Sequence, residues 1–177
     1  MKILVVGGTR FFGIPMVNAL INAGHDVTVA TRGNNALSFC GSVKQVVMDR
    51  TDADSVKKAF ESNRFTEMTS PGCCGKATDA HFDVVIDKVA YSSNDVRALW
   101  PNIKCDRYIQ MSSCSVYKKD APLIRENEFD AAKYPLVWTD RTEDYDESKR
   151  QAERAAYEFM DAEKCVVVRY PIVLGEN

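Results

Sequence analysis

The amino-acid sequence predicts an α/β fold, in which helices cover both sides of a doubly wound parallel sheet. Two observations carry this prediction. The chain opens with an apolar strand, Lys2–Val6, which runs straight into a glycine-rich turn and then into a segment with helical periodicity. From there to the end, short runs of valine and isoleucine alternate with amphipathic segments. Such alternation is typical of parallel strands that are joined by right-handed helical crossovers.

The elements follow from the apolar pattern in chain order. Runs of β-branched residues predict further strands at 26–30, 45–48, 82–87, 107–111 and 165–169. Apolar residues at intervals of three and four predict helices from Gly13 to Ala23, from a cap at Thr51 or Asp52 through Phe60, from Asp95 to Trp100, and from Glu143 to Met160. Gly24 and Pro101 are helix stops. The last helix should turn Ala152, Ala155, Ala156 and Phe159 toward the sheet.

Length and composition set the class of protein. At 177 residues, with 45% hydrophobic and 27% charged residues, the chain should form one globular domain over 1–177. An irregular loop is expected at about 63–80 and a polar loop at 118–142. The net charge of −2 argues against a nucleic-acid partner. No apolar run approaches the roughly 20 residues of a membrane span, and no signal-peptide pattern opens the chain, so we expect a cytoplasmic location.

The cysteines predict neither disulfides nor a metal site. All six are scattered except the neighbours Cys73 and Cys74, which lack the spacing of a zinc knuckle. The two histidines, His25 and His81, add no ligand pattern. Free thiols in a reducing cytoplasm are the expected state.

The glycine-rich turn predicts a phosphate cradle. A buried strand, a glycine turn and a helix bring free backbone N–H groups and the positive end of a helix dipole to one point. The turn consists of Gly7, Gly8, Thr9, Arg10, Phe11, Phe12 and Gly13. Gly7 allows the tight turn, Gly8 adds flexibility, and Gly13 lets the helix approach the sheet. Arg10 stands where a dinucleotide fingerprint usually has glycine, and an ordinary glycine-rich turn is the alternative.

Residues after the next two strands bear on the choice of cofactor. An acidic residue after the second strand would favour NAD, whereas an arginine would accept the 2′-phosphate of NADP. Arg32 follows that strand and, with Arg10, favours NADP over NAD, although an exposed turn arginine would look the same. Asp49, after the third strand, could accept a hydrogen bond from the adenine amino group or could cap a helix. The fourth strand ends at a ligand-binding edge, where Val89, Ala90 and Tyr91 follow.

A possible catalytic group lies in the second half of the chain. Tyr145 and Lys149 are four residues apart, which places them on one helix face. An ammonium close to the phenol would lower its pKa, so that Tyr145 could exchange a proton with an alcohol or carbonyl. Ser113, after the fifth strand, would donate to the same substrate oxygen. On its own, however, this spacing also fits an exposed helix pair.

The motifs in this order resemble the extended short-chain dehydrogenase/reductase superfamily, and within it the NAD(P)-dependent epimerase/dehydratase family of nucleotide-sugar enzymes. The resemblance rests on Gly-Gly-Thr-Arg-Phe-Phe-Gly, Asp49-Arg50, the serine-rich segment 112–117, Tyr145 to Lys149, and Arg169-Tyr170-Pro171. It implies an NAD(P)-binding Rossmann fold, a nicotinamide dinucleotide, and a nucleotide-sugar substrate. It further implies that Ser113, Tyr145 and Lys149 are catalytic, that Arg50 belongs to the cofactor site, and that Pro171, Ile172 and Val173 line the nicotinamide.

Two departures qualify what the resemblance implies. Arg10 replaces the middle glycine of the family motif. Members of the family also continue for more than a hundred residues, so we expect most of the substrate domain to be absent after residue 177. The apolar surface left uncovered would favour self-association. Besides an oxidoreductase or epimerase, two readings therefore stay open: a non-catalytic cofactor-binding or RNA-associated module, and an inactive fragment of a longer epimerase.

Overall fold

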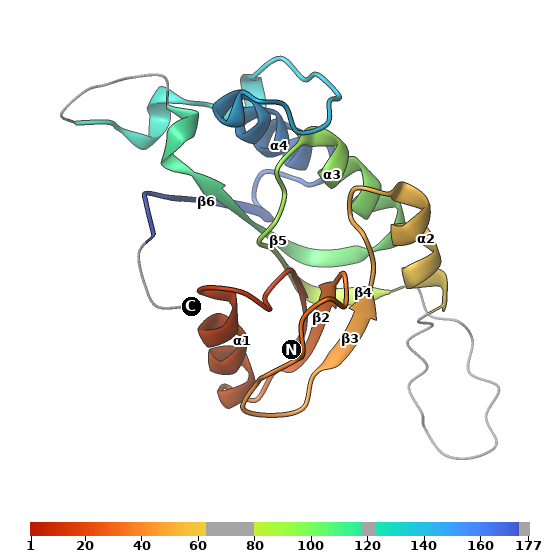
Figure 1. Cartoon of the computed structure of the whole chain (residues 1–177). Helices are drawn as coiled ribbons and strands as arrows, with labels where there is room; N and C mark the ends of the chain where they lie inside the picture. Colours follow the sequence, from red (N-terminus) through yellow and green to blue (C-terminus); the bar gives the residue numbers. More distant parts are fainter. Residues whose placement is uncertain (63–79, 118–122, 174–177) are drawn as a thin grey trace.

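A computed structural model describes residues 1–62, 80–117 and 123–173, and in this part of the chain it confirms the parallel α/β sheet (Figure 1). The strands are β1 (Lys2–Val6), β2 (Asp26–Thr31), β3 (Lys44–Val47), β4 (His81–Asp87), β5 (Lys104–Ser113) and β6 (Cys165–Tyr170). Their order in the sheet is β3-β2-β1-β4-β5-β6, and every neighbouring pair is parallel. This order belongs to the Rossmann-like, doubly wound class.

The order of the strands reverses between β1 and β4. Val6 pairs with Asp87 at the carboxyl ends of the two strands, and the next amide, of Lys88, donates to the Val6 carbonyl at 3.0 Å. Open α/β sheets bind ligands in the crevice outside such a reversal, because the connections on its two sides leave in opposite directions. The carboxyl ends of β1 and β4 are therefore the place to look for a site.

The helices divide between the two faces of the sheet. They are α1 (Gly13–Asn22), α2 (Ala53–Ser62), α3 (Ser93–Leu99) and α4 (Tyr145–Phe159). Successive residues of β1 point to opposite faces. Ile3 and Val5 pack in the core under α1, whereas Leu4 and Val6 pack in the core with residues of α2, α3 and α4. The sheet is thus buried on both sides, which explains its continuous apolar strands.

Local capping sets the helix boundaries and corrects some expected ones. The Asp52 carboxylate accepts from the amides of Asp54 and Ser55 at the start of α2, so Asp52 rather than Thr51 caps this helix. Ser92 and Asp95 form a capping box, which starts α3 at Ser93, two residues earlier than predicted. Likewise, the Asp144 side chain accepts from the Glu147 amide, so α4 begins at Tyr145 and not at Glu143.

Two other expectations differ from the structure. β5 runs on to Ser113 because Ser112 and Ser113 stay paired with Arg169 and Tyr170 of β6. Phe159, predicted to face the sheet like the buried Ala152, is 39% exposed and stacks on Trp100, with ring centroids 5.9 Å apart.

The connecting segments are only partly described. Of the loop expected at 63–80, residues 63–79 lie outside the described residues, as do 118–122 of the polar loop. From Leu123 on, that loop contains short 3-10 turns at Glu126–Glu128 and Ala131–Lys133. Among the described residues, no helix has the length and apolar character needed to cross a membrane.

Candidate functional site

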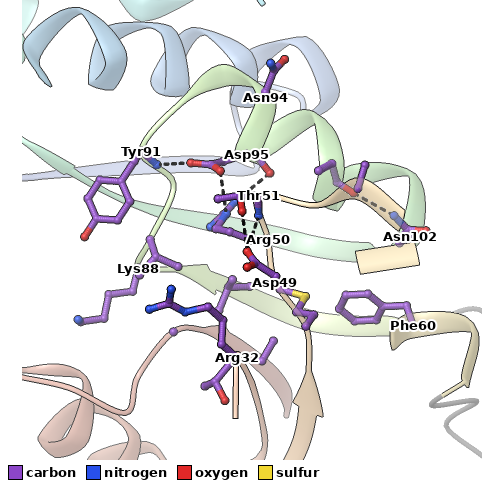
Figure 2. Close-up of a pocket in the computed structure, with 18 of the residues that line it drawn as sticks. Arg32, Asp49, Arg50, Thr51, Phe60, Lys88, Tyr91, Asn94, Asp95 and Asn102 are labelled. Atoms are coloured by element: carbon purple, nitrogen blue, oxygen red, sulfur yellow. Dashed lines mark hydrogen bonds and ion pairs between the residues drawn. The ribbon is translucent and has the colours of Figure 1, made fainter. Parts of the chain in front are cut away.

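A cleft of about 1680 Å³ opens at the carboxyl edge of the sheet, over the reversal point (Figure 2). Its lining comes from the turn after β1, from the ends of β2, β3 and β4, and from Asp140 and Arg141 before α4. Nine of the predicted cofactor residues line it: Gly7, Gly8, Thr9, Arg10, Arg32, Asp49, Arg50, Val89 and Tyr91. Residues that are far apart in the sequence therefore meet at one place, as the motif order predicts.

The other predicted residues lie beside the cleft and do not form its wall. Phe11, Phe12 and Gly13 complete the turn into α1, and Ala90 is buried behind Tyr91. Ser113, Tyr145 and Lys149 lie at the end of β5 and the start of α4. Pro171, Ile172 and Val173 follow β6 and are exposed. Their predicted contact with the nicotinamide stays a prediction.

The glycine turn has the backbone geometry of a cradle. Gly7 and Gly8 have φ angles of 88° and 115°, which side chains rarely tolerate. A Cβ on Gly13 would lie 2.6 Å from the Gly8 Cα, so α1 approaches the turn as closely as predicted. Gly8 also has a packing role, because a Cβ there would lie 3.1 Å from Val5 and 3.3 Å from Val17. The turn conformation and the close packing of α1 therefore require these three glycines, and residues 7–10 of the turn line the cleft.

Asp49 and Arg32 lie near each other at the ends of β3 and β2 (Figure 2). The Asp49 carboxylate accepts from the Thr51 hydroxyl at 2.7 Å and from the Thr51 amide at 3.0 Å. These hydrogen bonds, together with the charge of Arg32, lower the pKa of Asp49. Since Asp52 caps α2, the capping alternative for Asp49 is wrong, and adenine recognition stays a prediction.

Arg50 is the predicted cofactor residue whose side chain points elsewhere. Its guanidinium is buried and binds both carboxylate oxygens of Asp87, with Nη2 at 2.9 Å from Oδ2. Nη2 also donates to the Asp95 carbonyl at 2.9 Å. Burial alone would lower the pKa of Arg50, but Asp87 and Asp95 raise it, and the group stays charged. With its donors turned into the protein, Arg50 supports the ends of β3 and β4 and is not placed to bind a cofactor through its guanidinium.

Lys149 lies behind the cleft in a pocket of backbone carbonyls. Its Nζ donates to the carbonyls of Ala90 at 2.7 Å and Met111 at 2.9 Å, and the side chain is buried. Burial lowers the pKa of Lys149 to about 8, against the opposing effect of Asp87 and Glu153. An ammonium has three N–H donors, so one is left for a further acceptor after these two bonds.

The electrostatics of Tyr145 differ from the prediction. The pKa of Tyr145 is raised, because burial outweighs the lowering effect of a hydrogen bond with Ser113 and of the Arg141 charge. The net direction is opposite to the lowering that was expected from Lys149. The Ser113 side chain is close enough to contribute to the pKa of Tyr145. A raised pKa keeps the phenol protonated at neutral pH and makes it a weaker acid than an ordinary tyrosine.

The sequence argument did not find Arg141 or Lys88 as residues of the site. The Arg141 guanidinium lies 5.0 Å from the centroid of the predicted Tyr91 ring, and the Lys149 ammonium lies 5.4 Å from it. Lys88 lines the cleft directly after β4. Its place between a predicted strand and Val89 was visible in the sequence, but nothing there showed the direction of its side chain.

The site fits a dinucleotide on two observations. Gly7 and Gly8 hold positive φ angles in a tight turn, and this turn opens onto a long cleft. The side chains of Arg10, Arg32 and Lys88 line the same cleft, and cationic side chains of this kind bind phosphate groups.

Four cysteines and one exposed polar cluster lie outside the lining of the cleft. Cys40, Cys105, Cys114 and Cys165 are free thiols, as predicted, while Cys73 and Cys74 lie outside the described residues. Ligand atoms of His81, Asp83 and Asp106 lie within 4.8 Å of one another, at the opposite edge of the sheet from the cleft. Side chains of this kind commonly cluster without a metal ion.

Comparisons with known proteins agree with the fold. The sequence model described as "NAD dependent epimerase/dehydratase family" matches residues 3–177. Among solved structures, WbmG from Bordetella bronchiseptica in complex with NAD superposes with a TM-score of 0.63 at 17% identity, covering 96% of this chain and 52% of that one. A UDP-glucose 4-epimerase from Thermotoga maritima with UDP-glucose gives a TM-score of 0.63 at 17% identity, with 96% and 55% coverage.

A curated relative has a different description. The chloroplast stem-loop binding protein of 41 kDa b from Arabidopsis thaliana is 29% identical over 132 residues, which cover 67% of this chain and 30% of that protein. The chain thus spans about half the length of the solved structures and less than a third of the plant protein.

Proposed function

Because the chain belongs to the NAD dependent epimerase/dehydratase family, we propose that it binds a nicotinamide dinucleotide along the cleft and acts as an oxidoreductase or epimerase of the nucleotide-sugar type. The observation that carries this proposal is the convergence of the glycine turn, the strand ends and Lys149 on one edge of the sheet. When bound, the nicotinamide supplies the hydride chemistry.

We further propose that Ser113, Tyr145 and Lys149 handle the proton. The Ser113 side chain is close enough to Tyr145 to affect the pKa of the phenol, and this closeness supports the proposal that both hydroxyls reach a single substrate oxygen. In the reducing direction, Tyr145 donates its proton to a carbonyl oxygen, and Ser113 stabilises the charge that develops there. In the oxidising direction, the tyrosinate accepts the proton of the alcohol. Lys149 holds the Ala90 and Met111 carbonyls and the neighbouring Tyr91 ring in place. Its third N–H donor can bind a ribose hydroxyl.

We propose NADP as the preferred cofactor, with NAD as the alternative. Arg32 is exposed at the end of β2 and Arg10 is exposed in the glycine turn, both within the lining of the cleft. An arginine at this position accepts a 2′-phosphate. The nearby Asp49 carboxylate partly neutralises the charge of Arg32. We therefore propose a moderate preference for NADP over NAD.

The cofactor proposal is tested by titrating NADP and NAD into the wild type and Arg32→Ala. We expect Arg32→Ala to weaken NADP about tenfold or more and to leave NAD nearly unchanged, because a charge-assisted hydrogen bond contributes about 1.5–3 kcal/mol. Arg107→Ala, which removes an exposed arginine of β5, is the matched control. Equal losses for both cofactors, or no loss, would remove the phosphate role of Arg32.

A second candidate function comes from the Arabidopsis relative, whose name describes a stem-loop binding protein. In this second function, the chain binds an RNA stem-loop through the same cleft, where Arg10, Arg32 and Lys88 contact phosphates. The net charge of −2 ranks this function below the first. An RNA affinity that falls steeply with salt, and that NADP abolishes by competition, would favour it. If the chain binds neither the dinucleotides nor RNA, the inactive-fragment reading stands.

A further inference from the structure

Lys88 occupies the reversal point of the sheet. It is the first residue after β4, and its amide donates to the Val6 carbonyl, one residue before the glycine turn. Its Cβ would lie 3.5 Å from a Cβ on Gly7. Figure 2 shows the Lys88 side chain running along the cleft, on the same side as the Arg32 guanidinium. The backbone of the cradle and the base of this side chain are therefore adjacent.

The ammonium of Lys88 has an aromatic neighbour but no anion. Its Nζ lies 4.4 Å from the centroid of the Phe12 ring. Among the described residues, no carboxylate forms an ion pair with it, unlike Lys44, which binds Asp26 at 2.7 Å. Lys88 is half-buried, and burial lowers its pKa. A partly desolvated cation without a counter-charge costs free energy, and an anionic ligand would remove that cost.

The position of Lys88 in the sheet indicates which phosphate group it would bind. Lys88 follows β4 and Arg32 follows β2, and these strands flank β1 on opposite sides. Neighbouring strands are about 4.8 Å apart, so the two cations arise from points separated by about 10 Å, with the glycine turn between them. A dinucleotide with a 2′-phosphate carries phosphate groups at two places, and the closeness of Lys88 to Gly7 assigns Lys88 to the phosphates that the glycine turn would hold.

We propose that Lys88 binds the diphosphate of the dinucleotide, opposite the backbone amides of the glycine turn. The inference rests on the proposed function, since it assigns a ligand group to a residue of that same cleft. Arg32 then contacts the 2′-phosphate, and Lys88 contacts the diphosphate. The Phe12 ring holds the lysine side chain in place before the ligand arrives.

The test compares two ligands that differ in their phosphates. NADP carries both the diphosphate and the 2′-phosphate, whereas ADP-ribose carries only the diphosphate. We expect Lys88→Met to weaken both ligands by about tenfold to a hundredfold, in line with the loss of a charge-assisted hydrogen bond. Arg32→Ala should weaken NADP only. Lys88→Arg should retain most of the affinity, and Lys58→Met, on an exposed lysine of α2 outside the lining of the cleft, should retain all of it.

Stability measurements and the remaining binding results distinguish a failure of the Lys88 inference from a failure of the proposed function. Urea unfolding of Lys88→Met should match the wild type, because the variant removes a partly buried charge and leaves the aliphatic packing. An ADP-ribose affinity within about twofold of the wild type in Lys88→Met would overturn the inference and leave the proposed function intact. So would a loss that is accompanied by unfolding and not rescued by arginine. A wild type that binds neither ligand would overturn both.

Discussion

The Arg50 guanidinium and the Asp87 carboxylate form a buried two-point ion pair that joins the segments following β3 and β4. Tyr108 Oη also donates to Asp87 Oδ2 at 2.8 Å, and the Val89 amide donates to Oδ1 at 3.1 Å. Through Arg50 and the Val89 amide, Asp87 thus fixes two parts of the cleft wall. The pair contributes to the shape of the site without facing a ligand.

Breaking this pair should cost much of the stability of the fold. Asp87→Asn removes the main partner of the buried Arg50 charge and leaves it only the Asp95 carboxylate, 3.7 Å from Nε, so we expect a loss of about 3–5 kcal/mol of unfolding free energy. Asp26→Asn breaks the exposed Lys44 pair and should cost less than about 1 kcal/mol. Urea unfolding of both variants and the wild type measures the difference. Similar small losses in both variants would show that Arg50 finds other compensation.

The depressed pKa of Lys149 should make stability depend on pH. Its pKa is about 8 in the folded chain against 10.5 for an ordinary lysine, so between these values the unfolded chain binds more protons. Stability from this group therefore rises with pH in that window and is lost as pH falls through about 8. The wild type should gain about 2 kcal/mol relative to Lys149→Met between about pH 7 and about pH 9.5. Parallel pH profiles of the two proteins would contradict the buried, cationic assignment.

Two glycine substitutions should separate steric from conformational cost. Gly13→Ala places a Cβ within 2.6–2.8 Å of the Gly8 backbone, which has to shift. We expect a loss of more than about 2 kcal/mol together with weaker NADP binding. At Gly24, φ is 79° and nothing lies within 4 Å of a Cβ, so Gly24→Ala should cost only about 1 kcal/mol and leave binding unchanged. Urea unfolding and NADP titration measure both effects; an undisturbed Gly13→Ala would mean that the turn can open freely.

Removing the Ser113 hydroxyl should raise the pKa of Tyr145 further. The hydrogen bond with Ser113 lowers that pKa, while burial raises it. Ultraviolet titration of tyrosinate in Ser113→Ala measures the change, and Tyr145→Phe identifies which part of the signal comes from Tyr145. A Tyr145 transition at the same pH in the wild type and in Ser113→Ala would show that the two hydroxyls do not act together.

Local patterns predicted the strands and the turn because each depends on neighbours in the sequence. The run Lys2–Val6 before Gly7 is apolar on both faces, which only a strand buried on both sides requires. The sequence did not predict the direction in which individual side chains point. Arg50 follows Asp49 in the chain, and yet one turns inward to Asp87, 37 residues away, while the other stays in a local turn with Thr51. The predicted direction of the Tyr145 pKa shift was wrong for a related reason. Spacing along a helix shows neither how deeply a side chain is buried nor that Lys149 donates to backbone carbonyls.

By itself, the sequence determined that this protein is a parallel α/β domain of the NAD dependent epimerase/dehydratase family, with a glycine turn at the end of its first strand. Apolar periodicity and glycine conformations depend on neighbouring residues, so the sequence alone is enough to predict them. Only the tertiary structure decided which cations face the cleft, because burial and long-range pairing set their direction. It paired Arg50 with Asp87, enclosed Lys149 among carbonyls, and placed Lys88 without a counter-charge among the described residues, beside the glycine turn.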